Sequence, residues 1–145
     1  MGAGKSKIGE YLAKTLEDSF LLDLDLNANG PVEGLNQALG HKNVVSELYH
    51  GNSHTTDPKW VKEFKERGFI ILSFILNASL ETHKRRLMKR PDSRSNDDIE
   101  HHHNKFHVEL KPIFKDSAEI DEITIDTDGK EIEQIGDEIL EYSVP

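Results

Sequence analysis

Apolar residues at the start of the chain recur at intervals of three and four, and a mainly apolar run with two aspartates follows. The spacing predicts a helix over residues 5–17 with one buried face. Residues 20–26, the run FLLDLDL, are typical of a buried strand. Residues 27–42 contain Asn-Gly-Pro and two further glycines, which predicts a loop with one weak helix, and residues 43–49 favour a second strand.

The middle of the chain holds the most uniformly apolar segment. Asp57 and Pro58 supply a cap acceptor and a first helical residue, which predicts a helix that ends at Gly68. Residues 69–76 read FIILSFIL, with almost no polar position on either side of a strand. We therefore expect a central parallel strand that is covered on both faces.

Helices and strands continue to alternate toward the end of the chain. Ser79 is placed to cap a helix that runs to about Arg90, and acidic residues 97–98 suit the start of another. Residues 122–125 predict a short strand, and the turn at Asp128 leads into a terminal amphipathic helix. Such alternation predicts one α/β domain over residues 1–145, with helices on both sides of a parallel sheet.

Composition narrows the classes of function. The chain has 145 residues, a net charge of −9, no cysteine and no apolar segment of about 18 residues. We therefore expect no membrane span, no disulfide, no broad nucleic-acid binding and a cytoplasmic location. Six cationic residues nevertheless gather within residues 84–94, an arrangement that suits a compact anion.

The first residues match the end of the phosphate-binding loop pattern G-x-x-x-x-G-K-S/T. In that loop glycine lets backbone amides turn toward phosphate oxygens, the lysine charge reaches the outer phosphates, and the serine hydroxyl binds Mg²⁺. The pattern opens a predicted helix, as the loop requires. The expected ATP-binding residues here are Gly2, Ala3, Gly4, Lys5, Ser6 and Lys7.

The first glycine of that pattern and the strand before it are absent from the sequence. That strand normally lies at the centre of the sheet. We expect from this that the sequence is a shortened form of a longer chain.

With these elements in this order, the chain resembles the nucleoside-monophosphate and shikimate kinase group of small-molecule kinases. The resemblance implies a three-layer α/β/α P-loop fold with a mostly parallel sheet and a short lid over residues 87–97. Asp23 and Asp25 match the D-x-D of such kinases, where one carboxylate holds Mg²⁺ and the other orients or deprotonates the acceptor hydroxyl. We expect Asp23 on the metal and Asp25 in catalysis.

The same resemblance implies roles for the basic helix and the last loop. Arg86 matches the arginine that packs on adenine, and Arg90 and Arg94 match lid arginines that stabilise the transferring phosphoryl group. Asp128 lies in a segment similar to the loop that borders adenine. A solvent-exposed basic helix and a purely geometric Asp-Gly turn remain alternatives for these segments.

The segment expected to bind the phosphoryl acceptor is short, since only about eighteen residues separate Asp25 from the next strand. We expect Glu47 as a further Mg²⁺ or acceptor group, and the other acceptor candidates are His50, Asn52 and His54. Of the histidines at 101–103 and 107, only His103 and His107 share a helix face, so a solvated face is favoured over a metal site.

These observations predict an ATP- and Mg²⁺-dependent phosphotransferase that acts on a small hydroxyl or phosphate acceptor. A nucleotide-binding regulatory or inactive module is the alternative. A GTPase is disfavoured, because the base-reading string Asn-Lys-x-Asp is absent from the sequence.

Overall fold

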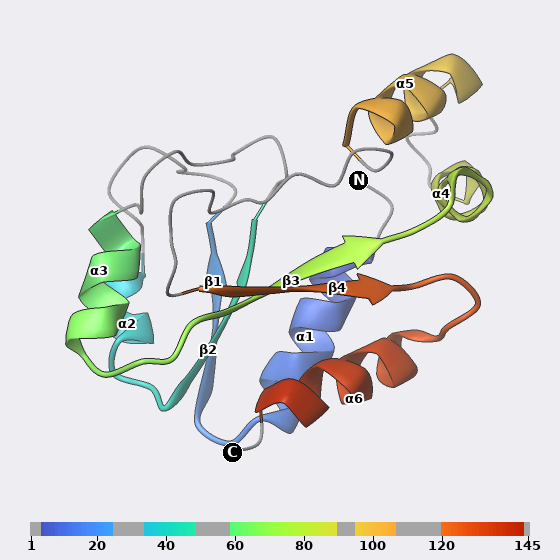
Figure 1. Ribbon diagram of the computed structural model, residues 1–145. Helices are drawn as coiled ribbons and strands as arrows, with labels where there is room; N and C mark the ends of the chain where they lie inside the picture. Colours follow the sequence, from blue (N-terminus) through green and yellow to red (C-terminus); the bar gives the residue numbers. More distant parts are fainter. Residues whose placement is uncertain (1–3, 25–33, 49–58, 90–94, 107–119, 144–145) are drawn as a thin grey trace.

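The computed structural model describes residues 4–24, 34–48, 59–89, 95–106 and 120–143, without the side chains of Asp23, Lys105 and Phe106. Helices and strands alternate along these residues, which confirms the α/β class (Figure 1). The elements in chain order are α1 (Lys5–Thr15), β1 (Ser19–Asp23), α2 (Leu35–Ala38), β2 (Asn43–Glu47), α3 (Lys59–Glu66), β3 (Leu72–Asn77), α4 (Leu80–Met88), α5 (Asn96–Phe106), β4 (Asp121–Asp126) and α6 (Ile132–Ser143).

The described strands pair in parallel as two separate two-stranded sheets. β1 pairs with β2 so that Asp23 lies opposite Glu47, and β3 pairs with β4 so that Asn77 lies opposite Asp126. The expectation of a central, fully covered strand at residues 69–76 is wrong for the described part of the chain. β3 begins at Leu72, pairs there with β4 alone, and is partly exposed at all six positions. An apolar run shows that a strand prefers burial, but it does not fix how many neighbours the strand acquires.

The β1–β2 sheet lies between α1 and a core formed with α2 and α3. Residues alternate along each strand, so Phe20 and Leu22 pack into this core while Leu21 lies near Gly9 of α1. Trp60 of α3 is buried in this core. The buried members of this cluster are Leu22, Leu24, Ala38, Trp60, Val61, Phe64 and Ile120.

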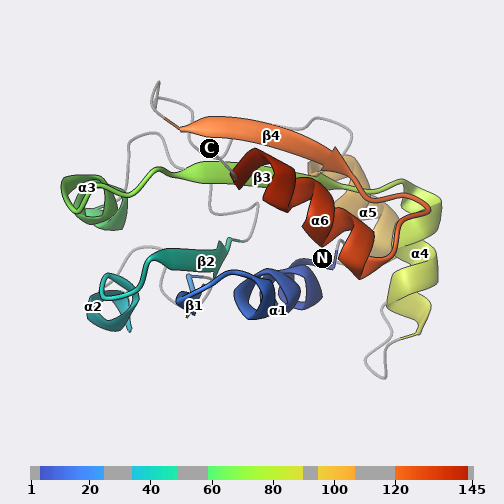
Figure 2. The same ribbon diagram turned by 90° about the horizontal axis from the view of Figure 1, so that it is seen from below.

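A second core joins α1 and α6 to the β3–β4 sheet. α1 and α6 lie side by side in both views, and α6 follows one face of β3 and β4 (Figure 2). Partly buried residues of β2 and β3 pack against the same cluster, so it connects the two sheets. Its buried members are Ile8, Leu12, Ile125, Ile135 and Ile139.

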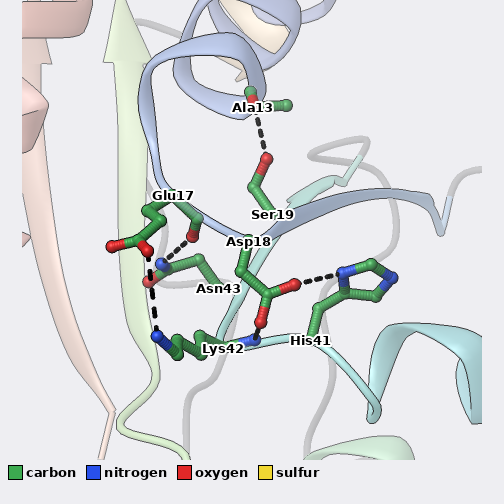
Figure 3. A network of polar contacts seen from close by, with 7 residues as sticks. All are labelled: Ala13, Glu17, Asp18, Ser19, His41, Lys42 and Asn43. Atoms are coloured by element: carbon green, nitrogen blue, oxygen red, sulfur yellow. Dashed lines mark hydrogen bonds and ion pairs between the residues drawn. The ribbon is translucent and has the colours of Figure 1, made fainter.

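A polar network fixes the amino ends of β1 and β2 (Figure 3). The Asp18 carboxylate lies 2.8 Å from Nδ1 of His41 and accepts a hydrogen bond from the Lys42 amide at 3.1 Å. Asn43 donates to the carbonyl of Glu17 at 2.7 Å. These bonds hold the pKa of Asp18 below its ordinary value, with His41 as the main cause. The network ties the turn before β1 to the turn before β2 and so supports their register.

Candidate functional site

The start of α1 has a backbone conformation that favours glycine. Gly4 precedes the helix with φ 87°, a left-handed conformation that residues with a Cβ rarely adopt. Lys5 and Ser6 begin the first turn of the helix. Backbone amides in this turn have no carbonyl partner within the helix. Lys7 is exposed on the same turn, and Gly2 and Ala3 lie outside the described residues.

Glu47 reaches this turn from the end of β2. Glu47 and Val45 share one side of the strand because side chains alternate, and Val45 packs against the cluster that contains α1. The Ser6 hydroxyl donates a hydrogen bond to Oε2 of Glu47 at 3.0 Å, although the two residues are 41 positions apart. The structure therefore brings together two of the three side chains that were predicted to bind a metal ion.

Asp23, the third predicted metal ligand, ends β1. Its backbone pairs in register with that of Glu47, so the two residues end adjacent parallel strands. The side chain of Asp23 lies outside the described part of the structure, as do Asp25, His50, Asn52 and His54.

Arg86 lies on α4, whose start follows from its cap. Ser79 accepts a hydrogen bond from the Thr82 amide at 3.2 Å, which confirms the predicted N-cap. The Arg86 guanidinium donates to Oγ1 of Thr127 at 3.0 Å and to the Thr127 carbonyl at 2.9 Å. Burial lowers the pKa of Arg86, and the nearby carboxylate of Asp128 opposes this shift. Arg86 is therefore partly buried against the loop after β4, in contrast to a fully solvated basic helix.

Asp128 follows Thr127 in that loop. Its Oδ1 accepts the Ser79 amide at 2.9 Å, so it ties the loop to the start of α4. Burial raises the pKa of Asp128, but hydrogen bonds from Ser79 and Thr82 and the charge of Arg86 outweigh it, so the pKa lies below its ordinary value. The two residues expected to border adenine, Arg86 and Asp128, thus belong to one connected group.

The predicted lid is described only at its ends. Arg90 and Arg94 lie outside the described residues. Beyond the gap, α5 begins at Asn96, and Asp97 and Asp98 occupy its first turn as expected. Lys84 of α4 and Glu100 of α5 form an ion pair that joins the two helices.

A second contact between α4 and α5 corrects the histidine prediction. His103 was expected on a solvated face, but its Nδ1 lies 3.0 Å from Nδ1 of His83, and it is partly buried. His83 is buried with 1 % of its surface exposed. Burial, followed by the charge of His103, lowers the pKa of His83 to about 4. His107 lies outside the described residues.

The side chains of two residues of this region, His83 and Thr127, were given no role from the sequence. His83 precedes Leu87 by four positions, so helical periodicity already placed it on the buried face of its helix. Thr127 gave no comparable signal, because its hydroxyl gains importance only through partners that are 41 and 50 positions away.

The oxygen donors beside α1 fit a magnesium ion bound together with phosphates. Mg²⁺ usually takes one or two carboxylates, keeps several waters and completes its shell with substrate phosphates. Ser6 and Glu47 offer such donors. Within the described ranges, no three His, Asp or Glu side chains gather as a group that holds a metal by itself. None of the described helices has the length and apolar character needed to cross a membrane.

The sequence was compared with models of protein families and with curated proteins. No family model matches the chain, and no curated protein matches it significantly.

Proposed function

We propose that the chain is an ATP-dependent phosphotransferase that moves the γ-phosphoryl group to a small hydroxyl or phosphate acceptor. The observation that carries the proposal is the hydrogen bond between Ser6 and Glu47 at the start of α1. A serine of the first helical turn beside a carboxylate at the carboxyl end of a parallel strand is the arrangement expected of an Mg·ATP site. A P-loop fold of three layers is part of the proposal, and α1 covering the parallel β1–β2 pair supports it.

The described residues have distinct parts in this proposal. The first amides of α1 and the Lys5 ammonium bind the phosphates, while the Ser6 hydroxyl and the Glu47 carboxylate hold Mg²⁺ directly or through water. When bound, Mg²⁺ neutralises charge on the phosphates. Arg86 offers a planar cation to the nucleobase beside the loop that contains Asp128.

The transfer step rests on residues outside the described part of the chain. Asp25 orients or deprotonates the acceptor hydroxyl, and Arg90 and Arg94 stabilise charge on the transferring group. Asp23 adds a second carboxylate to the metal side, since its backbone lies opposite that of Glu47.

Nucleotide binding is tested by calorimetric titration with Mg·ATP. Lys5→Ala removes the charge on the outer phosphates and is expected to abolish detectable binding, whereas Lys14→Ala changes an exposed lysine of the same helix and serves as the matched control. Wild-type protein that takes up no Mg·ATP, or a Lys5→Ala variant that binds as well as the control, would refute the proposed site.

Transfer is tested by screening nucleosides, nucleotides, sugars and small hydroxy acids for acceptor-dependent ADP release. Asp25→Asn should retain ATP affinity and lose transfer. ATP binding without ADP release from any acceptor would instead support the alternative, a regulatory nucleotide-binding module.

A further inference from the structure

Thr127 is a fully buried polar residue directly after β4, with 0 % of its surface exposed. Its hydroxyl donates to the carbonyl of Asn77 at 2.8 Å, and its amide donates to the same carbonyl at 2.9 Å. Asn77 is the last residue of β3. Thr127 therefore joins the carboxyl ends of β3 and β4, where ligands bind in parallel α/β sheets.

The same hydroxyl also helps to hold Arg86. Because the hydroxyl proton is directed at Asn77, an oxygen lone pair remains for Arg86, which donates to Oγ1 at 3.0 Å and to the carbonyl of Thr127 at 2.9 Å. Two bonds from the two terminal nitrogens to one residue fix both the position and the plane of the guanidinium. A long arginine side chain that is not held in this way loses more rotamer entropy when it binds a ligand.

We infer that Thr127 is a positioning residue that presents the Arg86 guanidinium plane to the nucleobase of ATP. This inference rests on the proposed function, because it assigns a role within the same nucleotide site. A guanidinium held flat by its edge keeps its face available for stacking on an aromatic ring. Thr127 acts through Arg86 and does not itself contact the base.

Asp128 follows Thr127 and attracts Arg86 by its charge, while its Oδ1 accepts the Ser79 amide. Arg85, next to Arg86 on α4, is exposed and offers a matched control for loss of charge from this helix.

The experiment compares Mg·ATP with magnesium tripolyphosphate, which carries phosphates but no base, in calorimetric titrations of the wild type, Thr127→Val and Thr127→Ser. Valine keeps the shape and removes the hydroxyl, whereas serine keeps the hydroxyl. We expect Thr127→Val to weaken ATP binding about tenfold, the size of one charge-assisted hydrogen bond. Tripolyphosphate binding should change by less than about twofold, and Thr127→Ser should restore ATP affinity to within about threefold of the wild type.

Coupling to Arg86 is measured in the same assay. Arg86→Ala should weaken ATP binding by itself and by a clearly smaller factor in the Thr127→Val background, where the bond to the backbone carbonyl of residue 127 remains, whereas Arg85→Ala should act additively with Thr127→Val. Additive effects of Arg86→Ala and Thr127→Val would overturn the inference.

Two further results separate this inference from the proposed function. If the wild type binds both ligands and Thr127→Val binds ATP normally, or loses both ligands equally, the positioning role is wrong and the phosphate site stands. If the wild type binds neither ligand, the proposed function fails and the positioning role fails with it.

Discussion

Acid should destabilise the fold through His83. This histidine is buried between α4 and α5, where it faces His103 and His102 of α5 and Arg86 of its own helix. Burial, followed by the positive charge of these neighbours, lowers its pKa to about 4, from an ordinary value of about 6.5 in the unfolded chain. Between these two values the unfolded state binds more protons than the folded state. The stability contributed by neutral His83 is therefore complete above about pH 7 and is lost as the pH falls toward 4.

The magnitude follows from the two pKa values. At pH 5 the unfolded imidazole is almost fully protonated and the folded one is mostly neutral, which lowers the free energy of unfolding by about 2 kcal/mol relative to pH 7.5. Partial solvent screening at the junction of the two helices brings this figure to about 1–2 kcal/mol. The pKa of His103 is also lowered, mainly by burial, so His103 adds to the effect with the same sign.

The assay is urea unfolding at pH 7.5, 6.5, 5.5 and 5.0, with the free energy of unfolding obtained by linear extrapolation. His83→Phe removes the titrating group, so its fall in stability between pH 7.5 and 5.0 should be smaller than that of the wild type by about 1–2 kcal/mol. His101→Gln, on the exposed face of α5, should leave the wild-type slope unchanged. Equal slopes for His83→Phe and the wild type would refute the reasoning, whatever the absolute stability of the variant.

Three other predictions concern the nucleotide site and the packing of helices. Ser6→Ala and Glu47→Gln should each weaken Mg²⁺-dependent ATP binding about tenfold in calorimetry while Ser6→Thr retains it, and unchanged binding in both would contradict the metal assignment. Gly136→Ala should lower the free energy of unfolding by about 1–3 kcal/mol, because its Cβ would lie 2.2 Å from the Tyr11 ring. This cost should shrink in a Tyr11→Ala background, and an undiminished cost would argue against the contact. Ser79→Ala removes the cap of α4 and should cost about 1 kcal/mol in thermal or urea unfolding, whereas Ser79→Asn, which keeps an uncharged cap acceptor, should cost less.

Local chemistry explains where sequence reasoning succeeded. The cap at Ser79, the acidic start of α5 and the apolar face of α6 each depend on residues within a few positions, so the starts of these helices were predicted closely. Strand ends were less accurate, since β3 begins three residues later than expected. Apolar residues before a strand can pack without joining it, as Phe69 and Ile71 do against the first core.

The candidate site also contains some residues that the local sequence identifies and others that only tertiary contacts identify. Glycine at position 4 and the Lys-Ser pair after it are recognisable from the sequence because they match a local phosphate-loop pattern, and Gly4 takes a left-handed conformation before α1. Glu47 was predicted as a site residue from its place near the end of a predicted strand, but only its contact with Ser6 gives it a definite partner. His103 was assigned to a solvated face because periodicity within one helix does not reveal which second helix covers it.

The sequence by itself determined the alternation of helices and strands, the helix start that suits a phosphate, and the positions of the basic residues. Tertiary structure alone decided that the described strands form two parallel pairs, that Ser6 meets Glu47, and that Arg86 is held by Thr127. The physical reason is the range of the interactions. Backbone propensities and caps act over one or two turns, whereas strand neighbours and buried hydrogen bonds depend on how the whole chain packs.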